Sequence, residues 1–377
     1  MHAASPLRAE ATAQPARRTV PLSSPDLTAT ERRYVLAALE SGWVSGTGPY
    51  ITDFEQRFAQ KCDRQHALAV ANGTLALETV LRALGIGPGD EVILPALTFA
   101  APASSVLAVG ASVVLVDISP ETWTIDPQRL SEVITPKSRA IIAVDVLGHP
   151  ADYDALGGFG LPIIEDAAEA HGARYKGRPC GSFGAASIFS FHANKPITTG
   201  EGGCVTTDSP DLAGAMRLLA NHGMSAERPY VHDVVGRNFR MTNLVAAVGL
   251  GQLDRWDELL AARERVCARY DQLLDGSAYT GRPVAEWADY SPWLHTIAVE
   301  NRAQVLAYVR ERGVDARAIW PTLGSQPLFG PVRHFPVAEE VAAGALWLPT
   351  SSAMSDEDVS YVSSTVNEAL AHAGGSR

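Results

Sequence analysis

Short apolar runs recur along the first half of the chain, and segments of helix length separate them. The runs occupy 67–71, 91–94, 112–116, 140–144 and 161–164. Short runs that consist mainly of apolar residues are typical of strands that are buried on both faces of a sheet. The pattern therefore predicts an α/β fold with a mainly parallel, doubly wound sheet.

Two helices are predicted before the first of these runs. Thr28 and Glu31 have the spacing of a capping box, which predicts a helix that begins there and continues through Leu39. Phe54 and Phe58 lie one helical turn apart and predict the apolar stripe of the next helix.

The rest of the chain predicts a second, smaller unit. One or two long helices are expected over 242–274, followed by shorter strand and helix patterns from Trp287 onward. We expect a large domain over 20–252, and a long helix with a small α+β domain over 253–377. Residues 1–19 are rich in Ala, Pro and Arg, and we expect a disordered tail there.

Composition excludes several classes of protein. The 377 residues are 46% hydrophobic and 19% charged, a composition that predicts a globular chain. The formal net charge of -11 opposes nonspecific binding to the phosphate backbone of nucleic acids. We expect no membrane span, since no apolar run approaches the length of about 20 residues that crosses a bilayer. The four cysteines lack C-x-x-C spacing and the N-terminus lacks a signal peptide, so a cytoplasmic location is expected.

Three segments whose residues could bind a ligand or take part in catalysis follow the predicted strands. Asn72-Gly73-Thr74, 95–99 and Glu165-Asp166 each come directly after an apolar run. Ligands of such sheets bind beyond the carboxyl ends of the strands, so the three segments are expected to converge on one crevice. Amides at a strand-to-helix junction suit a phosphate, although an Asn-Gly pair is also common in ordinary turns.

Lys195 predicts the chemistry of this crevice. It lies in the segment SFHANKPITTGEGG over 190–203, where small, hydroxyl and glycine residues would let a flat cofactor approach. A lysine can form a Schiff base with pyridoxal 5′-phosphate (PLP), and Asp166 would keep the cofactor's ring nitrogen protonated. Taken singly, Lys195 could be a solvated surface residue, Asp166 a helix N-cap and Phe99 a core residue.

Six ordered motifs together resemble the DegT/DnrJ/EryC1/StrS family of PLP-dependent sugar aminotransferases. They are Asn72-Gly73-Thr74, 89–93, Thr98-Phe99, 165–172, Asn194-Lys195 with 199–203, and 238–242. The resemblance extends from about residue 21 to the C-terminus. It implies a fold-type-I transferase with a seven-stranded, mainly parallel sheet, usually a homodimer with its active site at the subunit interface.

The resemblance also implies roles for individual residues. Lys195 would bind PLP covalently and Asp166 would pair with its ring nitrogen. Further cofactor contacts would come from Gly73, Thr74, Leu75, Phe99, Glu169, Ser190 and Asn238, with Asn238 reaching the cofactor of the neighbouring subunit. Substrate contacts would come from Trp43, Ser45, Thr47, His192, Arg240, Arg317 and Trp320. A solvated Arg317 and a plain strand hydroxyl at Ser190 remain alternatives.

The implied reaction moves an amino group from L-glutamate or L-glutamine to a nucleotide-linked keto sugar, with pyridoxamine phosphate as the intermediate form of the cofactor. Within the family, the chain is most similar to GDP-perosamine synthases, which aminate the 4-keto carbon of GDP-4-keto-6-deoxy-D-mannose. A 3-keto position, a dTDP or UDP sugar, and an aminocyclitol ketone are the alternatives. His192-Ala193 and Trp320-Pro321-Thr322-Leu323 depart from the perosamine pattern and leave the acceptor open.

Three other functions are compatible with parts of the sequence. A PLP-dependent sugar dehydratase would carry histidine in place of Lys195, so the lysine argues against it. A noncatalytic relative would have no need of Lys195, Asp166 and Asn238 together. A phosphate-binding module without PLP chemistry would be colourless and inert to borohydride.

Overall fold

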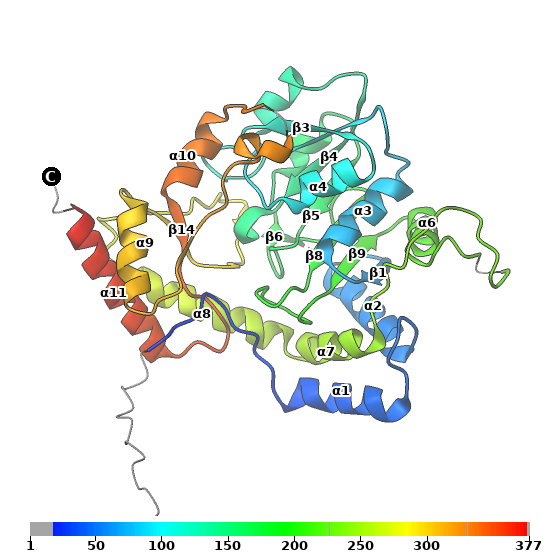
Figure 1. Ribbon diagram of the computed structural model, residues 1–377, viewed down its shortest axis with the longest axis horizontal. Helices are drawn as coiled ribbons and strands as arrows, with labels where there is room; N and C mark the ends of the chain where they lie inside the picture. The colour runs from blue at the N-terminus through cyan, green and yellow to red at the C-terminus, as the bar shows by residue number, and fades with distance from the viewer. Residues whose placement is uncertain (1–17, 226, 330, 375–377) are drawn as a thin grey trace, which may run out of the picture.

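The computed structural model of the chain describes residues 18–225, 227–329 and 331–374 (Figure 1). Its centre is a seven-stranded sheet in the order β1-β9-β8-β5-β4-β2-β3. The strands are β1 (His66–Val70), β2 (Glu91–Pro95), β3 (Ser112–Val116), β4 (Ser138–Val144), β5 (Ile163–Asp166), β8 (Ala186–Ser190) and β9 (Gly203–Thr207). Only β9 runs antiparallel to its two neighbours in this sheet. The predicted α/β fold with a mainly parallel seven-stranded sheet is confirmed.

Each of the five apolar runs corresponds to a strand, but the end of β5 differs from the prediction. Glu165 and Asp166 do not follow the strand, because they are its last two residues. Asp166 pairs in register with Val144 of β4 and with Ile188 of β8. The strand continues past its apolar residues because neighbouring backbone groups satisfy both carboxylates, and this compensation is invisible in a hydrophobicity pattern.

Helices cover both faces of the sheet (Figure 1). On one face, apolar strand residues pack with α3 (Gly73–Ala83), α4 (Ala101–Ala108) and α6 (Pro210–Ala220). On the other face, α2 (Pro49–Lys61) and α7 (Asn243–Asp254) cover β1, β8 and β9. Phe54 and Phe58 are fully buried there with stacked rings 5.7 Å apart, which confirms the predicted stripe.

The predicted helix boundaries are largely confirmed. The capping box of Thr28 and Glu31 opens α1 (Ala29–Ser41). The helical pattern over 242–274 is two helices, α7 and α8 (Trp256–Leu273), with Arg255 between them. The second predicted helix, α2, begins at Pro49, because proline is well tolerated in the first turn of a helix.

The C-terminal part contains a second sheet in the order β10-β12-β14-β13. Its strands are β10 (Thr280–Gly281), β12 (Thr296–Ala298), β13 (Arg317–Ala318) and β14 (Ala345–Trp347), and its helices are α9 (Arg302–Glu311), α10 (Pro336–Gly344) and α11 (Asp356–Gly374). A third sheet joins β11 (Ala288–Asp289) of this part to β6 (Arg174–Tyr175) and β7 (Arg178–Pro179). Short helices complete the fold: α5 (Tyr153–Gly157), η1 (Pro127–Glu132), η2 (Val146–Gly148), η3 (Leu323–Ser325) and η4 (Pro327–Phe329).

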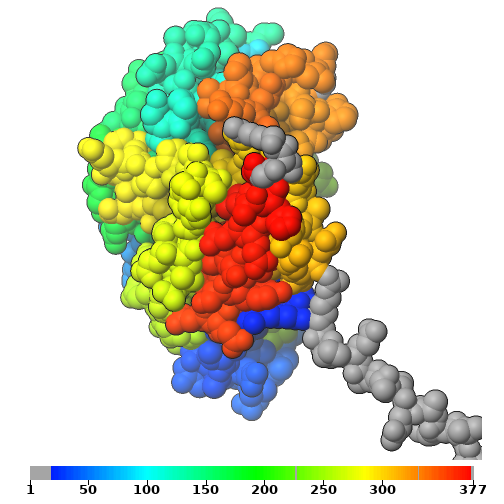
Figure 2. Space-filling view, turned by 90° about the vertical axis from the view of Figure 1, so that its left-hand side faces the viewer, coloured from blue at the N-terminus to red at the C-terminus, as the bar shows by residue number. Residues whose placement is uncertain are grey.

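The first described residues pack against the C-terminal part. Arg18 forms ion pairs with Glu357 and Asp358 of α11, and Val20 forms a parallel bridge with Val314 (Figure 2). Of the expected tail at 1–19, residues 1–17 lie outside the described residues. The division into domains at 252/253 stays a prediction. Among the described residues, the helices are too short or too polar to cross a bilayer.

The start of α3 and the start of β9 approach each other so closely that only glycine fits between them. A Cβ at Gly203 would lie 2.4 Å from the carbonyl carbon and oxygen of Asn72. A Cβ at Gly73 would lie 3.0 Å from the Cβ of Ser190. These two glycines bring the first turn of α3 against the ends of β8 and β9.

We expect Gly203→Ala to destabilise the protein by about 2 kcal/mol, because the new methyl group meets backbone atoms that cannot rotate away. The urea midpoint of cofactor-free protein measures this effect. Gly214→Ala is the matched control, since its Cβ would meet nothing within 4 Å and it lies inside α6. That change should be neutral or stabilising by about 0.5–1 kcal/mol. Equal midpoints for the two variants would contradict the steric argument.

Candidate active site

A cavity of about 690 Å³ lies beyond the carboxyl ends of β1, β2, β4, β5 and β8. The three segments predicted to converge all line it. The lining residues are Leu22, Asn72, Gly73, Thr74, Leu75, Leu77, Thr98, Phe99, Ala101, Pro102, Val144, Asp166, Ala168, Glu169, Ile188, Ser190, His192, Asn194, Lys195, Glu201, Trp293, Arg317, Trp320 and Trp347. One pocket therefore contains Lys195, Asp166 and most of the other predicted site residues.

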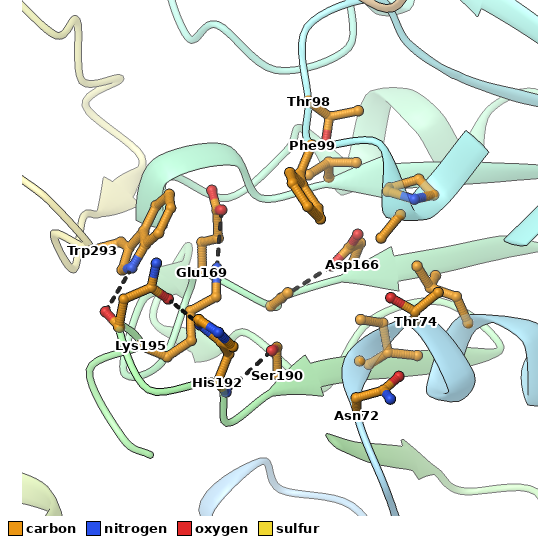
Figure 3. Close-up of a pocket in the computed structure, with 18 of the residues that line it drawn as sticks. Asn72, Thr74, Thr98, Phe99, Asp166, Glu169, Ser190, His192, Lys195 and Trp293 are labelled. Atoms are coloured by element: carbon orange, nitrogen blue, oxygen red, sulfur yellow. Dashed lines mark hydrogen bonds and ion pairs between the residues drawn. The ribbon is translucent and has the colours of Figure 1, made fainter. Parts of the chain in front are cut away.

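One end of the cavity is formed by the first turn of α3 (Figure 3). Asn72 caps the helix, and its Oδ1 accepts a hydrogen bond from the amide of Leu75 at 2.9 Å. The first amides of a helix have no acceptor within the helix, and the helix dipole places partial positive charge there. Gly73, Thr74 and Ser190 line this end of the cavity, which suits a phosphate group.

Asp166 lies at the end of β5 and faces the cavity (Figure 3). It is 4% exposed, and its Oδ1 accepts a hydrogen bond from the amide of Ala168 at 3.1 Å. Burial raises the pKa of Asp166 to about 7, and the positive charge of Lys195 only partly opposes this shift. A cationic ring nitrogen beside Asp166 would remove the desolvation penalty on its carboxylate.

Glu165 does not belong to this cavity, although it is adjacent to Asp166. Successive residues of a strand point to opposite faces, and Glu165 accepts hydrogen bonds from the amides of Gly181 and Phe183 and from the hydroxyl of Ser187. Burial raises the pKa of Glu165 and raises that of its neighbour Asp145 still further. The two acids of the motif therefore have separate roles: Asp166 faces the cavity, and Glu165 anchors the loop before β8.

Lys195 lies at the opposite end of the cavity from α3 (Figure 3). Its side chain is 10% exposed, and Nζ lies 3.1 Å from Oε1 of Glu169. The other oxygen of Glu169 accepts the amide of Leu147 at 2.8 Å. The ring of Trp293 lies on another side of the amine, with its centroid 3.9 Å from Nζ. The structure thus excludes a solvated surface position for Lys195.

Aromatic side chains line the cavity above these groups. Phe99 is 56% exposed yet lines the cavity, so its ring is not part of the core and offers a free apolar face. The ring of Trp320 lies 6.3 Å from that of Phe99 and stacks on Trp293 at 6.0 Å. A planar conjugated group fits such a wall.

Polar groups at the cavity include His192 and Arg317. The Nδ1 atom of His192 lies 3.0 Å from Oδ1 of Asn194, and its Nε2 atom lies 3.8 Å from a carboxylate oxygen of Glu201. Arg317 donates two hydrogen bonds to Asp315, at 3.1 and 2.8 Å. The Arg317 guanidinium therefore reaches the cavity, but a carboxylate already balances part of its charge.

Five predicted site residues do not line the cavity of their own chain. They form a separate surface, here called the outer patch, that consists of Trp43, Ser45, Thr47, Asn238 and Arg240. Asn243 joins its two segments, because its amide donates to the carbonyl of Ser45 at 2.7 Å and its side chain donates to that of Trp43 at 2.8 Å. The guanidinium of Arg240 donates to the side-chain oxygens of Asn238 and Asn221.

Two residues that hold the lysine segment, Trp293 and Arg263, were not predicted from the sequence. Trp293 belongs to none of the six motifs, and no pattern in the neighbouring sequence marks it as a site residue. Arg263 is 2% exposed and donates to the carbonyls of Trp293 at 2.6 Å and of Lys195 at 3.3 Å. A signal for Arg263 was present, because it interrupts the apolar stripe of α8 at the helical spacing of Leu259, Leu260, Val266 and Cys267.

The residues present fit PLP. The cavity offers helix amides for a phosphate, a free aromatic face, a buried carboxylate whose pKa is raised by burial, and a buried primary amine. Each of these groups matches one part of the cofactor.

Comparisons with known proteins agree with this geometry. The model of the DegT/DnrJ/EryC1/StrS aminotransferase family matches residues 25–367. GDP-perosamine synthase of Caulobacter vibrioides is 41% identical over 364 residues, which cover 93% of this chain and 98% of that protein. UDP-2-acetamido-2-deoxy-3-oxo-D-glucuronate aminotransferase of Pseudomonas aeruginosa is 38% identical over 310 residues, which cover 80% of this chain and 86% of that protein.

Among solved structures, Spr1654 of Streptococcus pneumoniae, a protein assigned as a sugar aminotransferase, matches in its pyridoxamine phosphate form. The TM-score is 0.90 at 30% identity, with 95% of this chain and 99% of that chain covered. The match to the family model extends over nearly all of the described residues. The chain therefore belongs to the DegT/DnrJ/EryC1/StrS aminotransferase family, and it is a PLP-dependent aminotransferase of fold type I.

Proposed function

We propose that the protein transfers an amino group from L-glutamate to the 4-keto carbon of GDP-4-keto-6-deoxy-D-mannose and so forms GDP-perosamine. The observation that carries this proposal is the 41% identity to a GDP-perosamine synthase over 98% of that protein. Two further proteins of that name are 35% and 33% identical over more than nine-tenths of this chain. L-Glutamine is the alternative donor.

Lys195 is the proposed catalytic residue. Bound PLP would supply an electron sink that stabilises negative charge on the carbon that loses its proton. The free amine of Lys195 then moves that proton, a role that an arginine cannot take because its guanidinium stays protonated. The amine of Lys195 donates a hydrogen bond to Oε1 of Glu169 at 3.1 Å, so the group that moves the proton is held in place between steps.

The remaining cavity residues bind and orient. The first-turn amides of α3 and the hydroxyl of Ser190 bind the phosphate group of the cofactor. The carboxylate of Asp166 forms an ion pair with the protonated ring nitrogen. Phe99 covers the ring. His192, Arg317 and Trp320 lie at the same cavity and are proposed to contact the nucleotide sugar.

We further propose a homodimer in which the outer patch of one subunit completes the cavity of the other. Exposed apolar side chains adjoin the patch, which is unusual for a surface that faces water alone. Trp43 and Val44 are 52% and 42% exposed, and Tyr230, Val234 and Val235 of the segment before Asn238 are 88%, 44% and 86% exposed. Arg240 and Asn238 would then bring a positive charge and an amide to the phosphate groups of the partner's ligands.

A 3-aminotransferase is the second candidate. The observation in its favour is the 38% identity to an enzyme whose named substrate is a 3-oxo UDP sugar. The departures from the perosamine pattern at His192 and Trp320 also lie at the cavity, where the acceptor would bind.

A panel of GDP, dTDP and UDP keto sugars with glutamate tests the proposal. We expect a product only from GDP-4-keto-6-deoxy-D-mannose, with the amino group at C4 by mass spectrometry and NMR. Lys195→Ala is the control and should form no product while it remains folded, because the change removes a nucleophile and little core volume. A product with nitrogen at C3 would establish the second candidate instead.

Asp166→Asn should retain the cofactor but lower turnover at least about tenfold, which corresponds to about 1.4 kcal/mol for one lost charge contact. The half-reaction with glutamate, followed by absorbance, measures this loss. An unchanged rate would show that Asp166 does not pair with the ring nitrogen.

The pH dependence of stability should also change in Asp166→Asn. The pKa of Asp166 is about 7 in the folded protein without cofactor and 3.8 for an ordinary carboxyl, so the unfolded chain loses its proton first as the pH rises. Between about pH 4 and pH 7, the free energy of unfolding of the cofactor-free wild type should therefore fall relative to that of the variant. Above pH 7, the difference between the two proteins should stay constant. Parallel curves over that range would contradict the raised pKa.

A mixed dimer tests the shared site. We expect Lys195→Ala and Asn238→Asp homodimers to be inactive, the latter because a carboxylate would repel phosphate. A heterodimer purified with two affinity tags should regain about half of the wild-type activity, since one of its two sites then has Lys195 from one subunit and Asn238 from the other. If both residues served the cavity of their own chain, the heterodimer would be inactive.

A further inference from the structure

We propose that the ring of Trp293 and the carboxylate of Glu169 form a seat for the ammonium group of Lys195, and that this seat shifts the enzyme's balance toward the form in which the lysine is free. This inference rests on the proposed function, since it takes Lys195 as the residue that condenses with the cofactor. Trp293 is then a specific partner of the free lysine, beyond its place in the wall of the cavity.

The contact geometry is that of a cation–π pair. Nζ of Lys195 lies 3.9 Å from the ring centroid of Trp293 and 3.1 Å from Oε1 of Glu169 (Figure 3). The lysine side chain is 10% exposed and Trp293 is 3% exposed. Cation–π attraction is strongest for tryptophan and increases when the pair is shielded from water. The ring and the carboxylate therefore both attract the amine in its cationic form.

The ring is fixed relative to the lysine by the lysine's own segment. The indole N–H of Trp293 donates to the carbonyl of Asn194, the residue before Lys195, at 2.9 Å. Arg263 joins the two segments a second time through the carbonyls of Trp293 and Lys195. Trp347 packs edge-on against the ring at 5.3 Å. The seat is therefore preorganised, and it costs little further ordering when the amine is released.

The seat acts in only one of the two forms of the enzyme. In the half-reaction, glutamate would give its amino group to the cofactor in place of the lysine nitrogen, water would supply the oxygen of the released 2-oxoglutarate, and Lys195 would be left as a free amine that can hold a proton. An interaction made in one form and not in the other shifts the equilibrium between them by its full free energy. The seat thus favours the pyridoxamine form with free lysine.

Trp293→Leu tests this inference through an equilibrium and not through turnover. Loaded enzyme is titrated with mixtures of glutamate and 2-oxoglutarate, and the absorbance of the pyridoxal form is measured. We expect the variant to need a glutamate to 2-oxoglutarate ratio at least about fivefold higher for half conversion, because the cation–π contact is lost. Trp293→Phe, which keeps a weaker π face, should fall between wild type and Trp293→Leu.

Trp287→Leu is the matched control. Trp287 packs against His149 and Tyr175 and is not among the residues that line the cavity, so this change removes the same kind of ring away from Nζ. We expect its equilibrium ratio to equal that of wild type within twofold. If Trp293→Leu does not fold, fluorinated tryptophan at position 293 keeps the shape and weakens the π face, and the ratio should rise with each added fluorine.

Failure of the inference and failure of the proposed function give different results. Borohydride reduction followed by peptide mapping shows which lysine carries the cofactor. If Lys195 carries it in every variant while the equilibrium ratio does not change, the seat is refuted and the proposed function stands. If the cofactor is bound to another residue, the proposed function itself is wrong.

Discussion

The burial of Asp166 at the end of β5 is the constraint on which the rest of the site depends. A carboxylate that is 4% exposed, with one amide donor at 3.1 Å, is costly to ionise without a cation beside it. The strand can end in this residue because its neighbour Glu165 points to the other face and is satisfied there by two amides and a hydroxyl. The fold thus holds a buried acid that a cationic group bound in the cavity would stabilise.

The segment that contains Lys195 is held by residues from the C-terminal third of the chain. Arg263 of α8 binds the carbonyls of Asn194 and Lys195, and Trp293 packs against the lysine amine. Burial lowers the pKa of Arg263 to about 10, and its acceptors include backbone carbonyls of the lysine segment and of residues 293 and 350. The C-terminal part is therefore a support for the site and also the source of its aromatic wall.

The cavity and the outer patch divide the predicted site residues into two groups. Those of the strand ends and of the lysine segment line one pocket, whereas Trp43, Ser45, Thr47, Asn238 and Arg240 gather around Asn243 on another surface. In a symmetric dimer, the outer patch of each subunit can lie against the cavity of the other subunit, so the two groups meet at two equivalent sites. The proposed interface follows from this division and from the exposed apolar side chains beside the patch.

The sequence by itself determined the α/β class, the positions of five strands of the central sheet, the capped first helix and the segments that converge on the cavity, because short-range periodicity and turn chemistry decide these features. It did not determine the extent of β5, where backbone pairing carries the strand through two acids. Trp293 was found only in the structure, since its role depends on a contact between residues 98 positions apart. Which face each acid takes, and which predicted residues share a cavity, was decided by tertiary packing, because long-range contacts leave no local pattern in the chain.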